Sequence, residues 1–339
     1  MGYGRAVSRC LVVPMLAAAL PAAFAADART CPDVSEPPAA VCLAATHGLA
    51  YADSQDDARL AASALDTAAV QFGQVFGRDL PPGLLVLSST FSAGDARQFA
   101  RDQGLAFSQS WLSPADKRAQ VETVMRRAMP DADAARIEGV LSQIAAQHVD
   151  TLRHELGHAQ YHAAFWPDAP PSPDVYGTPA PDWLDEASAV LMEGSEGRAA
   201  RERHFFEAWR QSSPAIRPLA EFLAMAHPVT AQQRALMQAQ GGTQTASGVQ
   251  VMMQRGPGGD ASGMFYSQSL LFADFLIDAS PDPHILGGIS AAVAGGIDFA
   301  DWLADSGAQH GLPLDVDGLQ TAWDAWCEAR ATAASDRAG

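Results

Sequence analysis

The chain has 339 residues, with 22 basic and 39 acidic side chains and a formal net charge of −17. A chain of this length can bury a substantial core and can form one large domain or two. The excess of acidic residues argues against nucleic acid or an anionic membrane surface as a partner.

The first 25 residues are typical of a secretory signal. Arg5 and Arg9 precede an apolar run over residues 11–20, and the sequence AFA at residues 23–25 offers a small-x-small cleavage site. The apolar run is shorter than the ~20 residues that a membrane span needs, and no later segment is long and apolar enough to span a membrane. Cleavage after residue 25 would leave 20 basic and 39 acidic residues. We therefore expect a mature chain that is secreted or periplasmic and has no transmembrane segment.

The mature chain would begin with a segment rich in proline and alanine, residues 26–56, which we expect to be an irregular lead-in. Cys31 and Cys42 bracket a short loop there and should pair in an oxidising compartment. A disulfide that closes a loop of this size is worth ~3 kcal/mol in the chain-entropy model. Cys327 is expected to be a small buried side chain, although the odd number of cysteines leaves other pairings open.

The pattern of the following residues predicts an α+β fold, with a small N-terminal sheet and helices packed over it. Apolar residues at helical spacing predict a helix over 57–77, and short strands are expected at 84–89 and 106–113, the second a candidate edge strand. Ser113-Pro114 opens a helix that ends at Pro130, and Asp133 should cap a long helix running to about residue 165. Later features are a proline-rich stretch at 166–182, a helix from 183 capped by Asp182, helices at 203–211, 218–226, 228–240, 264–278 and 316–332, a glycine-rich loop at 241–263, and a disordered tail at 331–339.

The predicted long helix carries the sequence TLRHELGHAQYH at residues 151–162. Residues four apart lie on one helical face, so His154 and His158 can direct their imidazoles at one point. Zinc accepts neutral histidine nitrogens, and Glu155 projects in a neighbouring direction from which it can reach a metal-bound water. Three fixed residues recur by chance at roughly the few-per-cent level, so an ordinary amphipathic helix is the alternative.

A zinc site needs a third ligand from elsewhere in the chain. His162 continues the same face but lies ~12 Å along the helix from the first histidine of the motif, and we interpret it as a bystander. Glu186 follows the second histidine after 27 intervening residues and has apolar neighbours, which favour an inward-pointing carboxylate. Two histidines and one carboxylate leave a fourth position for water. Asp182 and Asp185 are the alternatives for this ligand.

These motifs resemble the gluzincin zinc metallopeptidases, and within them the M1-like "peptidase MA" group. In that pattern HExxH is followed by a W-L-x-E-G-x-A-type helix that supplies the third ligand. HELGH at 154–158 and WLDEASAVLME at 183–193 carry the resemblance most strongly; YSQSLLFADFL at 266–276 and LPLDVDGLQTAWDAWCEA at 312–329 carry it more weakly. The likeness implies a zincin-like metallopeptidase domain over residues 57–330. This chain departs from the pattern in Ala187, where glycine is usual, in the proline-rich insertion, and in lacking the Gly-x-Met-Glu-Asn exopeptidase signature.

The resemblance implies a function and a role for each matching residue. One Zn²⁺ per chain would be bound by His154, His158 and Glu186, with Glu155 as general base and Tyr266 as a donor to the developing oxyanion. The expected activity is zinc-dependent hydrolysis of peptide bonds in a peptide or protein substrate.

Several alternatives remain open at this point. Asp185 could hold a histidine ligand by its outer nitrogen, or it could be only a charge at the start of a helix. Core packing is the alternative for Tyr266, while Tyr176 and His204 are other candidates for the oxyanion donor. The residues at 106–113 could pair with an extended peptide. The chain could also be a secreted binding or envelope protein that retains a zincin fold with little or no catalysis, or its histidines could be structural and bind no metal.

Overall fold

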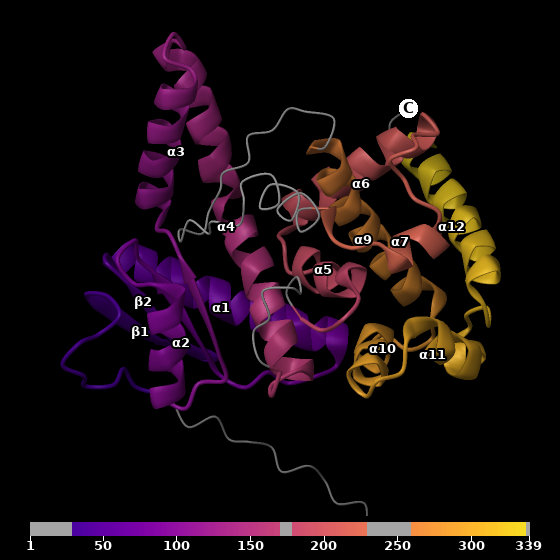
Figure 1. Cartoon of the computed structure of the whole chain (residues 1–339), viewed down its shortest axis with the longest axis horizontal. Helices are drawn as coiled ribbons and strands as arrows, with labels where there is room; N and C mark the ends of the chain where they lie inside the picture. Colours follow the sequence, from indigo (N-terminus) through magenta and orange to yellow (C-terminus); the bar gives the residue numbers. More distant parts are fainter. Residues whose placement is uncertain (1–28, 170–177, 229–258, 337–339) are drawn as a thin grey trace, which may run out of the picture.

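The computed structural model describes residues 29–169, 178–228 and 259–336, and it confirms the predicted α+β class (Figure 1). The N-terminal part contains a four-stranded sheet, and the rest of the described chain is helical. The strands lie in sequence order across the sheet: β1 (Val41–Ala45), β2 (Gly48–Ala52), β3 (Gly83–Leu87) and β4 (Phe107–Trp111). β1 is antiparallel to β2, whereas β2, β3 and β4 are mutually parallel. The strands expected at 84–89 and 106–113 are therefore present, the second at an edge of this sheet.

The first two strands lie inside residues 26–56, so the prediction of an irregular lead-in is wrong. β2 is entirely buried because it lies between β1 and β3 and helices cover both faces of the sheet there. Its partner β3 lies more than thirty residues away, and the local composition could not indicate that contact. The expected disulfide between Cys31 and Cys42 is present and ties the preceding segment to β1, while Cys327 is free and buried.

Two helices cover opposite faces of the sheet. Helix α1 (Gln55–Phe76) packs on one face, and α2 (Ala93–Asp102) packs on the other. α1 begins where the Ser54 hydroxyl accepts a hydrogen bond from the Asp57 N–H at 3.1 Å, and it ends at Gly77, whose φ of 61° favours glycine. The strand residues alternate between the two faces as a pleated sheet requires: Ala50, Ala52, Leu85 and Leu87 face α1, and Leu49, Tyr51, Leu84 and Val86 face α2.

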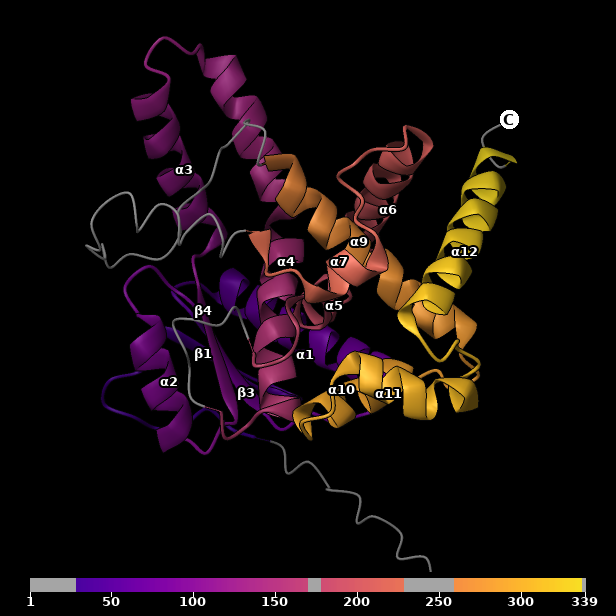
Figure 2. The same ribbon diagram turned by 45° about the vertical axis from the view of Figure 1, so that its right-hand side comes forward.

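Helix α3 (Pro114–Ala128) leads into the long helix α4 (Ala134–Phe165). α4 lies between the sheet and the described helices of residues 182–336, which are called the helical half (Figure 2). The predicted cap is present, since the Asp133 carboxylate accepts a hydrogen bond from the Arg136 N–H at 2.7 Å. One side of α4 places Leu152 and Leu156 in the core beneath the sheet. Another side places Tyr161 and Phe165 in the core of the helical half. The helix that carries HELGH is thereby held by both halves of the molecule.

The helical half encloses the largest core, centred on aromatic side chains. The ring of Trp183 lies 5.1 Å from the ring of Phe272 and 5.3 Å from that of Phe299, both in edge-to-face contact.

In the described parts of the chain, no helix is both long and apolar enough to cross a membrane. The helices here are α5 (Asp182–Val190), α6 (Ser195–Arg210), α7 (Leu219–Ala224), α9 (Gly259–Ala279), α10 (Ile285–Ala294), α11 (Phe299–Ser306), the 3₁₀ helix η1 (Gly307–His310) and α12 (Val316–Asp336).

Several expectations about this half need correction. Asp182 does not cap α5 but forms its first residue, and its carboxylate accepts the His227 N–H at 2.5 Å instead. α12 continues to Asp336, so the expected tail at 331–339 is helical over most of its length. α9 begins at Gly259, inside the expected loop at 241–263.

Two further expectations lie outside the described residues. The helix at 228–240 falls there apart from its first residue, and so does the signal over residues 1–25. Both stay predictions.

Candidate metal centre

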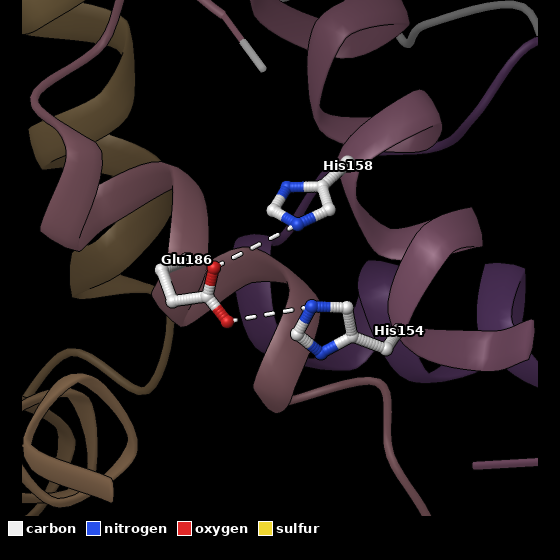
Figure 3. Close-up of side chains that lie close together, drawn as sticks. All are labelled: His154, His158 and Glu186. Carbon is white, nitrogen blue, oxygen red and sulfur yellow. Dashed lines mark ion pairs between the residues drawn. The ribbon is translucent and has the colours of Figure 1, made fainter. Parts of the chain in front are cut away.

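The structure brings His154, His158 and Glu186 together (Figure 3). Each offers one ligand atom, and these atoms all lie within 4.8 Å of one another. His154 Nε2 lies 3.4 Å from Glu186 Oε1, and His158 Nε2 lies 3.8 Å from Glu186 Oε2. Ligands at ~2.05 Å from a tetrahedral zinc are about 3.3 Å apart. Donor type and spacing both fit a zinc ion, which the two α4 histidines and the α5 carboxylate would hold.

A close approach between α4 and α5 makes this meeting possible. Gly157 lies between the two histidines, and a Cβ built on it would be 2.7 Å from Ala189 Cα and 2.8 Å from the Ser188 carbonyl oxygen. Those distances are shorter than side-chain contacts allow, so only glycine permits the observed helix separation. Glu186 faces α4 from the same short helix, whose residues from 183 to 190 are all buried.

Outer carboxylates orient both imidazoles. His154 Nδ1 lies 2.9 Å from Glu193 Oε1, and His158 Nδ1 lies 3.3 Å from Asp185 Oδ1. Each ring therefore presents Nε2 to Glu186 and Nδ1 to a carboxylate, which is the arrangement that fixes the tautomer of a metal-binding histidine. The contact between His158 and Asp185 supports the prediction that Asp185 holds a histidine ligand by its outer nitrogen.

Glu193 is itself held by Arg201. The Arg201 Nε donates to Glu193 Oε2 at 2.6 Å, and a second donor of the same guanidinium contacts Oε1. The guanidinium carbon also lies 4.9 Å from the centre of the Tyr266 ring, within range of a cation–π interaction. One side chain thus links the partner of His154 to the face of the tyrosine.

The pKa values of two residues in the ligand cluster are strongly shifted by their neighbours even without a metal. Burial alone would raise the pKa of the Glu186 carboxyl, but the imidazoles of His154, His227 and His158 outweigh it and lower that pKa to about 2. Burial would lower the pKa of His158, but the carboxylates of Asp185 and Glu186 raise it to about 9. The metal-free site therefore holds a carboxylate against a protonated imidazole.

A cavity of about 430 Å³ opens beside the cluster, lined by residues of α4, α6 and α9. Glu155 lines it together with His154, so the expected general base has access to the space next to the ligands. Tyr266 lines the same cavity, and its ring centre lies 5.7 Å from that of His154. His204 also lines it, with its Nδ1 3.1 Å from the Ser267 hydroxyl. Among the expected oxyanion donors, Tyr176 lies outside the described residues.

Sequence reasoning missed Glu193, its partner Arg201 and His227. Glu193 ends the motif WLDEASAVLME, which was the signal available for it, but it lies in the turn that follows α5 and not on that helix. His227 is fully buried, with its Nε2 3.4 Å from Glu186 Oε2. Nothing near it in the sequence indicates that contact. His162, interpreted as a bystander, is not part of the group of mutually close ligand atoms.

No protein-family model matches the chain, and no curated protein sequence or solved structure is significantly similar to it.

Replacing Gly157 by alanine should separate α4 from α5. We expect the free energy of unfolding to fall by about 1–3 kcal/mol, the usual effect of overpacking, despite the ~1 kcal/mol by which alanine is favoured in a helix. Denaturant unfolding of the metal-free protein measures the change. Gly139→Ala is the matched control, because Gly139 is on the same helix and a Cβ there meets nothing within 4 Å. That control should be stabilising, and equal effects of the two substitutions would contradict the close approach.

Metal binding should depend on pH through His158. Because the pKa of this imidazole is about 9 in the metal-free protein, it must lose a proton before Nε2 can bind a metal. The apparent affinity should therefore rise with pH, by up to about tenfold per unit between pH 7 and 9, and level off above that range. Calorimetry at pH 7 in buffers of different ionisation enthalpy should report about one proton released per metal. An affinity that is constant from pH 7 to 9 would argue against this protonation state.

Proposed function

We propose that this chain is a zinc-dependent peptidase of the gluzincin kind, in which His154, His158 and Glu186 hold one Zn²⁺. The observation that carries the proposal is the orientation of the two imidazoles: each turns Nε2 toward the same buried carboxylate and has a carboxylate behind its Nδ1. Two histidines packed in a core for structural reasons alone would not need this convergence. Three protein ligands also suit a catalytic zinc, because they leave a position open.

Glu155 is the proposed general base. A zinc ion at this site supplies a Lewis acid that polarises the scissile carbonyl and lowers the pKa of water to about 7. Glu155 is half-buried at the edge of the cavity, where its carboxylate can accept the proton of the attacking water and pass it to the leaving amine. Burial lowers the pKa of Lys117, and the negative charge of Glu155 opposes that effect.

The substrate would approach along the edge of the sheet. β4 is the last strand of the sheet among the described residues, and it contacts α4. An extended peptide can add to such an edge through main-chain hydrogen bonds. The Lys117 ammonium lies 5.5 Å from the ring centre of Trp111 at the end of this strand, next to the proposed path. Secretion or periplasmic location is in keeping with the disulfide at Cys31–Cys42.

Glu155→Gln should retain zinc and lose turnover by about 10²–10⁴-fold, the range for loss of a positioned general base. Cleavage is measured on a broad library of unstructured peptides, and bound metal by elemental analysis of the same samples. Glu138→Gln is the matched control, since Glu138 is an exposed α4 residue paired with Arg118. Retained activity in Glu155→Gln would remove the base assignment.

The same two readouts separate the other functions. Stoichiometric zinc with no cleavage by the wild-type chain would favour a binding protein that retains the fold. A chain without zinc would make the histidines structural.

Tyr266→Phe tests the proposed oxyanion donor. If the phenol hydrogen-bonds the developing negative charge, its removal should lower kcat by about 10²–10³-fold. Zinc content should stay close to the wild-type value, because the ring that packs near His154 is retained. A change in KM alone, with kcat unaltered, would place Tyr266 in ground-state binding instead.

A further inference from the structure

His227 lies against the proposed metal site but belongs to neither of the helices that carry its ligands. It follows α7, and the whole residue is buried. Its ring packs edge-on against Phe265 at 5.0 Å and lies 5.3 Å from the ring of Tyr266, inclined by 34°. Its Nε2 lies 3.4 Å from Glu186 Oε2. We propose that His227 is a positioning residue for Glu186, holding the second carboxylate oxygen and so controlling how Glu186 binds the metal. This inference rests on the proposed zinc site.

Helix α5 fixes His227 at two points on one face. The Asp182 carboxylate accepts the His227 backbone N–H at 2.5 Å, and four residues later Glu186 faces the His227 side chain. Residues four apart on a helix lie one turn above each other on the same side. The imidazole is therefore placed relative to Glu186 by the same helix that carries Glu186.

The carboxylate needs such a partner. A metal bound to one oxygen of Glu186 leaves the other oxygen in a core with no accessible surface. Each donor to a buried carboxylate oxygen offsets part of its lost hydration, and an oxygen that loses a donor can turn to the metal and occupy a second coordination position. An Nε2–H of His227 directed at Oε2, 3.4 Å away, would add a donor to this oxygen and favour a carboxylate that binds through one atom. The coordination position needed for water then stays open.

The geometry argues for this role rather than for a fourth protein ligand. The set of ligand atoms lying within 4.8 Å of one another contains His154, His158 and Glu186, and His227 is not part of it. A fourth protein ligand would also close the coordination sphere, as in structural zinc sites.

The test measures metal binding, with no need for catalysis. Zinc affinity is measured by competition with a chelator, and the visible spectrum of the Co²⁺-loaded protein reports the coordination number. His227→Ala should weaken zinc binding by about 10–100-fold, the usual effect of losing an outer partner of a ligand. It should also weaken the Co²⁺ absorption bands, as an added oxygen ligand raises the coordination number. His227→Gln places an amide N–H near the position of Nε2 and should recover most of the affinity and the wild-type spectrum.

His162→Gln is the matched control, a histidine on α4 outside the ligand group, and it should behave as wild type. Wild-type affinity and spectrum in His227→Ala would overturn the inference and leave the proposed function standing. A folded His227→Gln no better than His227→Ala would overturn it as well, because a ligand or a packing ring is not replaced by an amide. A wild-type chain that binds neither Zn²⁺ nor Co²⁺ would contradict the proposed function itself.

Discussion

The carboxylate of Glu186 has no accessible surface, and the rest of the site is organised around that buried charge. Removing a carboxylate from water costs several kcal/mol unless nearby groups compensate. Three imidazoles face it, from His154, His158 and His227. Two of these imidazoles have further carboxylates behind them, and one of those is paired with an arginine. Such alternation of charge through a core is costly to assemble, and the proposed divalent cation would give it a physical purpose.

The fold supplies the two sides of this site from two helices, of which α4 is packed into both cores and α5 into the core of the helical half. α4 is packed into the core beneath the sheet, so the sheet fixes the direction of the two histidines. α5 belongs to the core of the helical half and carries the carboxylate. Gly157 sets the distance between the two helices. A metal at this point would bridge the two halves, with the edge strand β4 and the cavity of about 430 Å³ next to it.

Elements with a strong local pattern could be predicted from the sequence, whereas long-range contacts could not. The apolar period of α1, the cap at Asp133 and the HExxH spacing are local features, and each corresponds to an observed element or juxtaposition. β1 and β2 form a local hairpin that escaped prediction because alanine and glycine give their residues a weak strand pattern, and only β2 pairs with the distant β3. Asp182 was expected to cap α5, because the sequence around it does not show that its carboxylate accepts a hydrogen bond from the distant His227 N–H. The inward position of Glu186 could be inferred because its apolar neighbours indicated burial. The contact of Glu186 with His227 could not be inferred, because His227 lies far away in the sequence.

The most direct test of the whole account is diffraction at the zinc absorption edge from crystals grown with zinc. One anomalous peak per chain is expected at the cluster, within about 2.0–2.2 Å of His154 Nε2, His158 Nε2 and an oxygen of Glu186. A non-protein oxygen should complete the coordination, with His227 bonded to the carboxylate. The proposed site would be contradicted by the absence of a peak at this cluster in zinc-saturated crystals. It would also be contradicted by a metal whose fourth coordination position is filled by a third imidazole.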